Sequence, residues 1–366
     1  MEAGDVMANE LQGQAYLNRV ASAVPNHDVH DAFVRFAGTL LADVRHEKLF
    51  RRMVDRADIH HRYSVLTAAE DPSGPSVDAH GFFRRGGFPS TAARMQRYQA
   101  EALPLALTAV ERLRLGPDAS TATHLIVTSC TGLYAPGLDL ELAGALGIAP
   151  SVERTMVGFM GCYAAFNALK LARHIVRSDR DARVLIVNLE LCTLHLQETS
   201  DLEQVLSFLV FADGCAASWV TAEPVGLALD RFRTVLLPDT ADLITWQVGD
   251  QGFDMYLSGK VPGAIGHGLR PVAPEILDGA AIGDIDLWAV HPGGRSVLDA
   301  AQNALELAPG ALDASRQVLA DFGNMSSATI MFVLEKLIAT AKPGERGAAM
   351  GFGPGLTAET MLFHAV

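Results

Sequence analysis

Short apolar runs and stretches with helical periodicity alternate along this chain. Mostly apolar residues fill His124–Cys130, Arg183–Leu189 and Gly214–Val220, which is typical of strands buried on both faces. Between the first two runs, apolar residues recur every three or four positions over Tyr163–Arg177, which predicts an amphipathic helix. Buried strands that alternate with helices predict an α/β fold with helices on both faces of its sheets.

The last third of the chain partly repeats this order. Leu287–Val290 predicts another apolar strand, Pro292–Gly294 a turn and Met325–Ala339 a long helix. We therefore predict two similar halves packed as one body, residues 1–222 and residues 223–366.

Three further segments predict local structure around these halves. Helical spacing of apolar residues runs from His30 to Arg56 and predicts one helix, whereas Ala68–Phe88 is rich in Gly, Pro and Ser and predicts a long loop. Val248–Met255 has no clear period, and we expect mixed turn and helix there.

Composition narrows the classes of function. Hydrophobic residues make up 49% of the 366 residues, enough for a large core, and the net charge of −13 argues against a broad nucleic-acid-binding face. The apolar runs are far shorter than the roughly 20 residues that a membrane-spanning helix needs. Met1–Ala8 has neither the basic start nor the apolar core of a secretion signal. We therefore expect a cytoplasmic protein with no membrane span.

The chain has four cysteines and no CxxC pair, so we expect reduced thiols and no metal site. Cys162 lies in the Gly-rich segment Gly158–Ala165, at the start of the predicted helix, whose positive end favours a nucleophilic thiolate. The alternative is a buried cysteine that packs as a small hydrophobic residue, and taken alone Cys162 fits that alternative better. The four are Cys130, Cys162, Cys192 and Cys215.

Two other residues stand where side chains often reach a site. His291 ends the strand Leu287–Val290 and precedes a glycine turn, and Asn324 precedes the last long helix. Taken singly, a hydrogen-bonded turn histidine and a helix-capping asparagine are sufficient explanations. Together with Cys162 they predict a Cys–His–Asn site.

Four short motifs stand in a distinctive order along the chain: Gly161-Cys162, His291–Gly294, Gly323–Ser327 and Gly351–Leu356. Over roughly residues 10–364, this order resembles the type III polyketide synthases, the chalcone-synthase-like enzymes of the thiolase fold. The resemblance implies a thiolase-like layered αβαβα fold made of two similar halves, the first carrying the Cys and the second the His and Asn.

The resemblance also implies the chemistry of an acyltransferase. Cys162 would accept an acyl starter from coenzyme A, supported as a thiolate by His291 as imidazolium. His291 and Asn324 would stabilise the enolate formed when malonyl-CoA loses carbon dioxide. The chain would extend by decarboxylative Claisen condensation and leave as a pyrone- or resorcinol-type product. Coenzyme A thioesters would be substrates with no cofactor or metal, and an acyl carrier protein is a further possible donor of the starter.

Substrate-contacting positions follow from the same resemblance. Phe211 and Met255 would separate the coenzyme A tunnel from the pocket as gatekeepers. Coenzyme A phosphates would bind Arg52 and Arg56, with Lys48 in place of a third basic position at which Leu49 stands. The residues expected to line the pocket are Cys130, Thr131, Cys192, Leu194, His195, Trp246 and Ser326.

The size of the starter has two interpretations. Trp246–Gly252 resembles bacterial alkylresorcinol and alkylpyrone synthases, which favours a narrow tunnel for a fatty acyl starter. Trp246 stands where plant relatives have glycine, and if it only packs in the core, the starter is malonyl-CoA or a small acyl-CoA. Relatives are homodimers, and we expect Val184–Leu189 at the subunit boundary.

Three other classes of protein share parts of this pattern. A β-ketoacyl carrier-protein synthase III uses the same triad, but Pro292–Gly294 after the histidine favours the polyketide synthase. The mid-chain position of the cysteine and the α/β pattern argue against a papain-like hydrolase. A non-enzymatic thiolase-fold binding protein would be expected to lose one of the three residues.

Overall fold

The computed structural model describes residues 13–41 and 43–366, so Met1–Ala8 lies outside the described residues. Nine strands form one mixed sheet in the order β11-β12-β13-β8-β1-β7-β6-β4-β5. The strands of this sheet are β1 (Tyr16–Ala23), β4 (His124–Ser129), β5 (Glu153–Gly158), β6 (Val184–Leu191), β7 (Asp213–Thr221), β8 (Leu227–Leu236), β11 (Leu287–Val290), β12 (Arg346–Gly353) and β13 (Thr357–Ala365). Two small ribbons join β2 (His27–Asp28) to β3 (Tyr63–Ser64), and β9 (Ile244–Gly249) to β10 (Gly252–Leu257).

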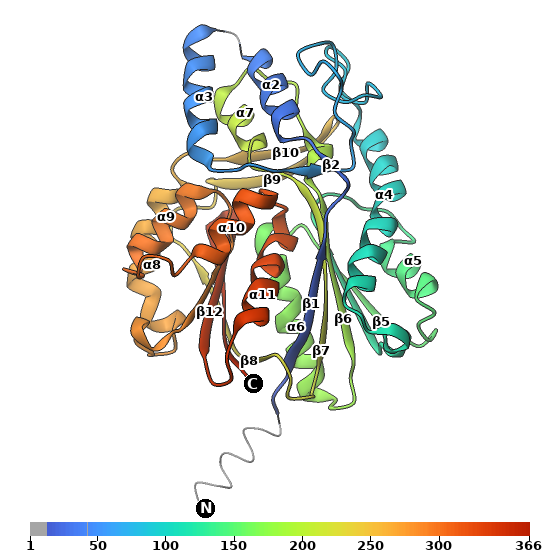
Figure 1. Ribbon diagram of the computed structural model, residues 1–366, viewed down its shortest axis with the longest axis vertical. Helices are drawn as coiled ribbons and strands as arrows, with labels where there is room; N and C mark the ends of the chain where they lie inside the picture. The colour runs from blue at the N-terminus through green and yellow to red at the C-terminus, as the bar shows by residue number, and fades with distance from the viewer. Residues whose placement is uncertain (1–12, 42) are drawn as a thin grey trace, which may run out of the picture.

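The sheet has two wings, β11-β12-β13-β8 and β1-β7-β6-β4-β5, which are joined by a short pairing of β8 with β1. Helices cover the outer faces of the wings and lie between them (Figure 1). In the described part of the chain, no helix is both long and apolar enough to cross a membrane. The helices are α2 (His30–Leu40), α3 (Val44–Ala57), α4 (Thr91–Arg112), α5 (Leu138–Ala145), α6 (Ala164–Ser178), α7 (Leu202–Phe208), α8 (Val261–Ile276), α9 (Arg295–Ala304), α10 (Asp313–Phe322) and α11 (Thr329–Thr340).

The faces that the strands present show how the layers stack. On β6, Val184 and Ile186 pack toward α6 and α11, whereas Leu185 and Val187 pack toward α4 and α5. The other wing has the same two-sided packing, with one face on α6 and α11 and the other on α8 and α9. Helix and sheet layers therefore alternate as αβαβα, because strands with apolar residues on both faces need helices on both.

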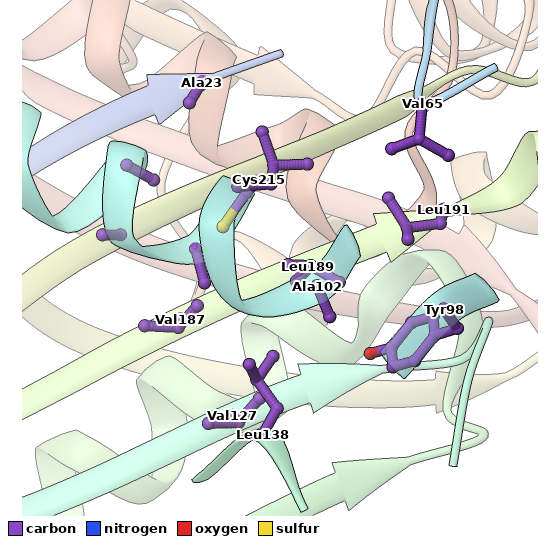
Figure 2. Packing of buried hydrophobic residues seen from close by; sticks show 14 of the residues in the cluster. Ala23, Val65, Tyr98, Ala102, Val127, Leu138, Val187, Leu189, Leu191 and Cys215 are labelled. Carbon is purple, nitrogen blue, oxygen red and sulfur yellow. The ribbon is translucent and has the colours of Figure 1, made fainter. Parts of the chain in front are cut away.

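The outer core on the α4 side is formed by side chains that point toward each other from helix and strands (Figure 2). Tyr98 and Ala102 of α4 face Val127 of β4 and Leu189 of β6. The strands predicted at His124–Cys130, Arg183–Leu189 and Gly214–Val220 and the helix predicted at Tyr163–Arg177 are confirmed within one to two residues at each end.

The single helix predicted from His30 to Arg56 is wrong. Helix α2 ends at Leu40, where Leu41 has an extended backbone, and α3 begins at Val44. The Asp43 carboxylate accepts hydrogen bonds from the backbone N–H groups of Arg45 and His46, so it caps a new helix. The capping signal outweighs the continuous apolar spacing.

The mixed turn and helix expected at Val248–Met255 is also wrong, because this segment lies in the β9–β10 hairpin. Gly252, with φ of +99°, supplies the left-handed residue that the tight turn requires. Met255 pairs with Trp246 across this hairpin, and β10 contacts α7. Figure 1 shows the hairpin at the end of the layered body that also carries α2, α3 and α7.

The subunit boundary expected at Val184–Leu189 is contradicted. Strand β6 lies between β4 and β7, and every one of its residues is buried within the single chain. The free edge on that side is β5, most of whose residues are exposed.

Candidate active site

Cys162 lies on a tight turn between β5 and α6, as the Gly-rich segment predicts. Gly161 has φ of +71°, and a Cβ there would lie 2.3 Å from Pro354, so only glycine fits. A 3₁₀ turn, Gly161–Tyr163, carries the thiol to the start of α6. Cys162 is partly accessible, whereas Cys130, Cys192 and Cys215 are buried.

Desolvation dominates the electrostatics of Cys162. It raises the pKa of the thiol to about 12, although contacts with the side chains of Ser326 and Asn324 lower it, and the charge of Glu190 raises it further. Burial therefore opposes an isolated thiolate at Cys162, so a thiolate here needs a neighbouring cation or a base that takes the proton.

His291 lies immediately after β11, where two backbone bonds fix it. Its N–H donates to the carbonyl of Met350 (2.8 Å), and its carbonyl accepts from the N–H of Gly293 (2.9 Å). Neither ring nitrogen has a hydrogen-bond partner among the described residues, and burial lowers the pKa of His291 to about 3. Burial favours the neutral imidazole when His291 is taken alone, and the ion pair with Cys162 that the resemblance implies stays a prediction.

Asn324 joins the segment after α10 to the start of β7. Its backbone N–H donates to the carbonyl of Val210 (2.7 Å), and its carbonyl accepts from Ala212 (2.9 Å). The side-chain Nδ2 donates to the carbonyl of Gly293 (3.3 Å), and Oδ1 accepts from the N–H of Ser326 (2.8 Å). Asn324 thus supports the turn before α11 and also links it to the loop after His291.

One cavity brings the three residues together. Cys162, His291 and Asn324 all line a space of about 30 Å³, with Phe211 and Met255 in its wall. A second cavity of about 30 Å³ lies on the other side, and Cys162, Phe211, Met255 and Ile244 line both. The two expected gatekeepers therefore stand between the cavities, with Ile244 as a third residue that the sequence did not indicate.

A wider groove of about 590 Å³ lies outside these cavities, between α3, α7 and α9. Arg56 and Leu49 line it, as does Arg295, which the sequence analysis missed. Arg52 and Lys48 are on the exposed face of α3 and not among the residues that line the groove.

The second of these cavities, called the inner cavity from here on, is lined by most of the expected pocket residues. Leu194 is the exception: it packs in the hydrophobic core on the α4 side and lines neither cavity. The expected residues that do line the inner cavity are Cys130, Thr131, Cys192, His195, Trp246 and Ser326.

Trp246 and His195 form a fixed wall of this cavity. Trp246 Nε1 donates to the carbonyl of Cys130 (2.8 Å). His195 Nε2 donates to the carbonyl of Thr131 (2.7 Å), Nδ1 accepts from the N–H of Phe253 (3.0 Å), and the ring stacks on Phe253 at 4.3 Å. Burial lowers the pKa of His195 to about 3, so it stays neutral.

Glu190 lies buried behind the cavity wall, and the sequence analysis missed it. Its carboxyl accepts from the backbone of Cys130 (2.9 Å), the hydroxyl of Thr131 (2.8 Å) and the hydroxyl of Ser327 (2.5 Å). Burial raises its pKa to about 7, although these hydrogen bonds lower it. A lone acidic residue inside an apolar strand is the signal that could have indicated it.

Two family models cover nearly the whole chain. Residues 5–224 match the N-terminal domain of chalcone and stilbene synthases, and residues 229–366 match the C-terminal domain. The chain belongs to this family, the type III polyketide synthases. It is therefore an acyltransferase, and the family assignment decides against a papain-like hydrolase and a β-ketoacyl carrier-protein synthase III.

Relatives of this synthase occur in Mycobacterium tuberculosis and in Oryza sativa subsp. japonica. The alpha-pyrone synthesis polyketide synthase-like Pks18 of Mycobacterium tuberculosis is 35% identical, over 96% of this chain and 91% of the relative. Bisdemethoxycurcumin synthase of Oryza sativa subsp. japonica is 34% identical, over 85% of this chain and 80% of the relative.

A solved structure supports the layered fold. PKS-I from the brown alga Ectocarpus siliculosus superposes with a TM-score of 0.84 and 28% identity, covering 96% of this chain and 98% of that one. The thiolase-like αβαβα architecture predicted from the sequence is confirmed.

Proposed function

We propose that this synthase loads a short acyl starter from coenzyme A onto Cys162, extends it with malonyl-CoA, and releases a small α-pyrone. The observation that carries the proposal is the single cavity lined by Cys162, His291 and Asn324. The relative Pks18, named for alpha-pyrone synthesis, supports the product class.

The first step is acyl transfer to the thiol. The unpartnered imidazole of His291 accepts the Cys162 proton, and the thiolate attacks the thioester carbonyl of the starter. Coenzyme A leaves as a thiolate and takes the proton from His291. Burial opposes each charge taken singly, so the thiolate and the imidazolium form together as an ion pair whose attraction offsets part of that cost.

The second step is decarboxylative condensation. The thioester carbonyl oxygen of malonyl-CoA lies between the side chains of His291 and Asn324, which stabilise the enolate as carbon dioxide leaves. The enolate carbon attacks the acyl group on Cys162, a carbon–carbon bond forms, and the Cys162 sulfur is released. Aligned donors of this kind are worth roughly 10²–10³ in rate.

The outer groove is the proposed path for the substrates. Arg56 and Arg295 line it, and Arg52 and Lys48 are exposed on the same helix as Arg56, so we place the coenzyme A phosphates there. An acyl carrier protein would present the same phosphopantetheine arm. The protein is incubated with an acyl-CoA or with the same acyl group on an acyl carrier protein, and acylation of Cys162 is measured by mass spectrometry. The donor that loads Cys162 faster is the source of the starter.

The inner cavity supports a short starter rather than a fatty tail. Its volume of about 30 Å³ exceeds by only two- to threefold the roughly 10–15 Å³ that one water molecule needs. Trp246 is held by its hydrogen bond to Cys130 and by contacts with His195 and Phe253, so the wall resists displacement. This favours the second of the two interpretations left open by the sequence.

Replacing Trp246 by glycine is expected to open this wall. The ratio of kcat/KM for an eight-carbon over a two-carbon acyl-CoA starter should rise about tenfold or more, because two newly buried methylenes are worth about 1.6 kcal/mol. Trp219→Phe, in the core on the α4 side, should leave the ratio unchanged. A wild-type kcat/KM that climbs steeply with tail length would overturn the short-starter proposal.

We infer that the synthase is a homodimer joined along the free edge of β5. An exposed edge strand can pair with a second copy, and Met156 on β5 is 40% exposed, with Met160 beside it at 36%. Light scattering should give twice the chain mass of 39.1 kDa. Thr155→Pro should lower it to one chain, whereas Val225→Glu, elsewhere on the surface, should not. A monomeric wild type would contradict the inference.

The proposed reaction is tested by incubating the protein with malonyl-CoA and a panel of acyl-CoA starters, with products read by mass spectrometry. We expect pyrones containing one starter and few malonyl-derived units. Free acid from the starter alone, with no extended product, would count against a synthase.

A further inference from the structure

Two arginines are wholly buried in this chain, and both lie behind the walls of the cavities. Arg62 and Arg94 each have 0% exposure and are the largest fully buried side chains. Neither forms an ion pair among the described residues; the acidic groups that act on them from farther away are Asp28 and Asp213 for Arg62 and Asp254 for Arg94. Each guanidinium lies over an aromatic ring, Phe33 for Arg62 (5.7 Å) and Phe83 for Arg94 (5.1 Å).

Arg62 ties together the segment that carries the gatekeeper Phe211. One nitrogen, Nη1, donates to the carbonyls of Phe208 (2.7 Å) and Phe211 (3.0 Å), and Nε donates to His30 Nδ1 (3.0 Å). Phe208 and Phe211 both line the inner cavity. The Arg62 side chain therefore holds two points of this wall from behind.

The same arginine lies against the segment that carries Asn324. A Cβ on Gly323 would lie 2.8 Å from Arg62 Cγ and 2.9 Å from the carbonyl of Val210. Asn324 itself pairs with Val210 and Ala212 through backbone hydrogen bonds. A shift of Arg62 would thus be transmitted to both Phe211 and Asn324, on the side of the cavity where malonyl-CoA is placed above.

Arg94 has the corresponding position at the inner wall. Its Nη1 donates to the carbonyls of Leu194 (2.9 Å) and Leu196 (2.8 Å), on either side of His195, and Nε donates to the carbonyl of Pro89 (2.9 Å). His195 in turn contacts Trp246 at a ring distance of 5.5 Å. Arg94 therefore fixes the backbone from which this wall projects.

We propose that these arginines are positioning residues for opposite walls: Arg62 for Phe211 and Asn324, and Arg94 for His195 and Trp246. The proposal rests on the function proposed above. Burying a cation whose nearest carboxylates are not in ion-pair contact costs stability, so an apolar residue would serve a purely structural role better. A planar guanidinium can bind several carbonyls at once in fixed directions, which a lysine ammonium or an apolar side chain cannot.

Substitutions of Arg62 and of Arg94 should therefore change different activities of the enzyme. In Arg62→Lys and Arg62→Met, malonyl-CoA decarboxylation per folded molecule should fall about 10- to 100-fold more than acyl loading of Cys162, because a small misplacement of Asn324 costs that much. In Arg94→Lys and Arg94→Met, the change should appear mainly in the ratio of long to short starters accepted. Methionine carries no charge, so the Met variants leave no buried cation out of place. Each position therefore has one variant that is expected to fold.

Val176→Ala is the matched control for destabilisation. Val176 is fully buried in the central core and lines neither cavity, so it should lower the melting temperature without moving either ratio. The proposal is overturned if the Arg62 and Arg94 variants behave as Val176→Ala does. In that case their melting temperatures fall, while the ratio of decarboxylation to loading and the ratio of long to short starters stay at the wild-type values. A wild type that decarboxylates no malonyl-CoA would instead refute the proposed function.

Discussion

Cys162→Ala is expected to abolish acyl loading and to lower product formation by at least about 10³-fold. Among the described cysteines, Cys162 alone lines both cavities and is partly accessible. Without its sulfur there is no covalent intermediate, and enolate formed from malonyl-CoA has no bound acyl group to attack. Intact mass after incubation with an acyl-CoA starter measures loading directly.

Cys215→Ala is the matched control, because Cys215 is a buried thiol in the core on the α4 side. It should load the starter as the wild type does. A thioester that still forms in Cys162→Ala would assign the nucleophile to Cys130 or Cys192, which line the inner cavity.

Asn324→Ala is expected to lower malonyl-CoA decarboxylation by roughly 10²–10³, while Cys162 still accepts a starter. The side chain of Asn324 lines the cavity with His291, so its loss removes one of the two donors that face the enolate oxygen in our account. Carbon dioxide release and starter loading are measured on the same preparation.

Asn167→Ala provides the comparison for this variant. Asn167 is a partly buried asparagine whose Nδ2 donates to Glu359 (3.1 Å), away from both cavities, and its loss should leave decarboxylation near the wild-type rate. Decarboxylation at the wild-type rate in Asn324→Ala would remove Asn324 from the mechanism.

The layers could be predicted because their signal is local. A strand such as β6, apolar on both faces, requires helices on both sides wherever it lies, and the Gly-rich turn before α6 is evident from Gly161. The β9–β10 hairpin could not, because its residues face a cavity rather than a continuous core and show no clear period. The strands of this hairpin are therefore evident only from the packing of the folded chain.

The effect of burial on the triad could not be predicted either. A helix start favours thiolate, but desolvation raises the pKa of Cys162, and desolvation depends on every element around the cavity. In the same way, Arg62 has no feature in the sequence that separates it from a surface charge, since only the fold shows that it is buried. Leu194 was misplaced because neighbouring residues of a 3₁₀ turn point in different directions.

The most direct measurement follows a single sample containing the wild-type protein, a short acyl-CoA and malonyl-CoA labelled in its free carboxyl carbon. Our account predicts that all of the label leaves as carbon dioxide, that a starter thioester forms on Cys162, and that the product contains the starter and unlabelled two-carbon units. Label retained in the product, or extension without any acyl group on Cys162, would contradict the account.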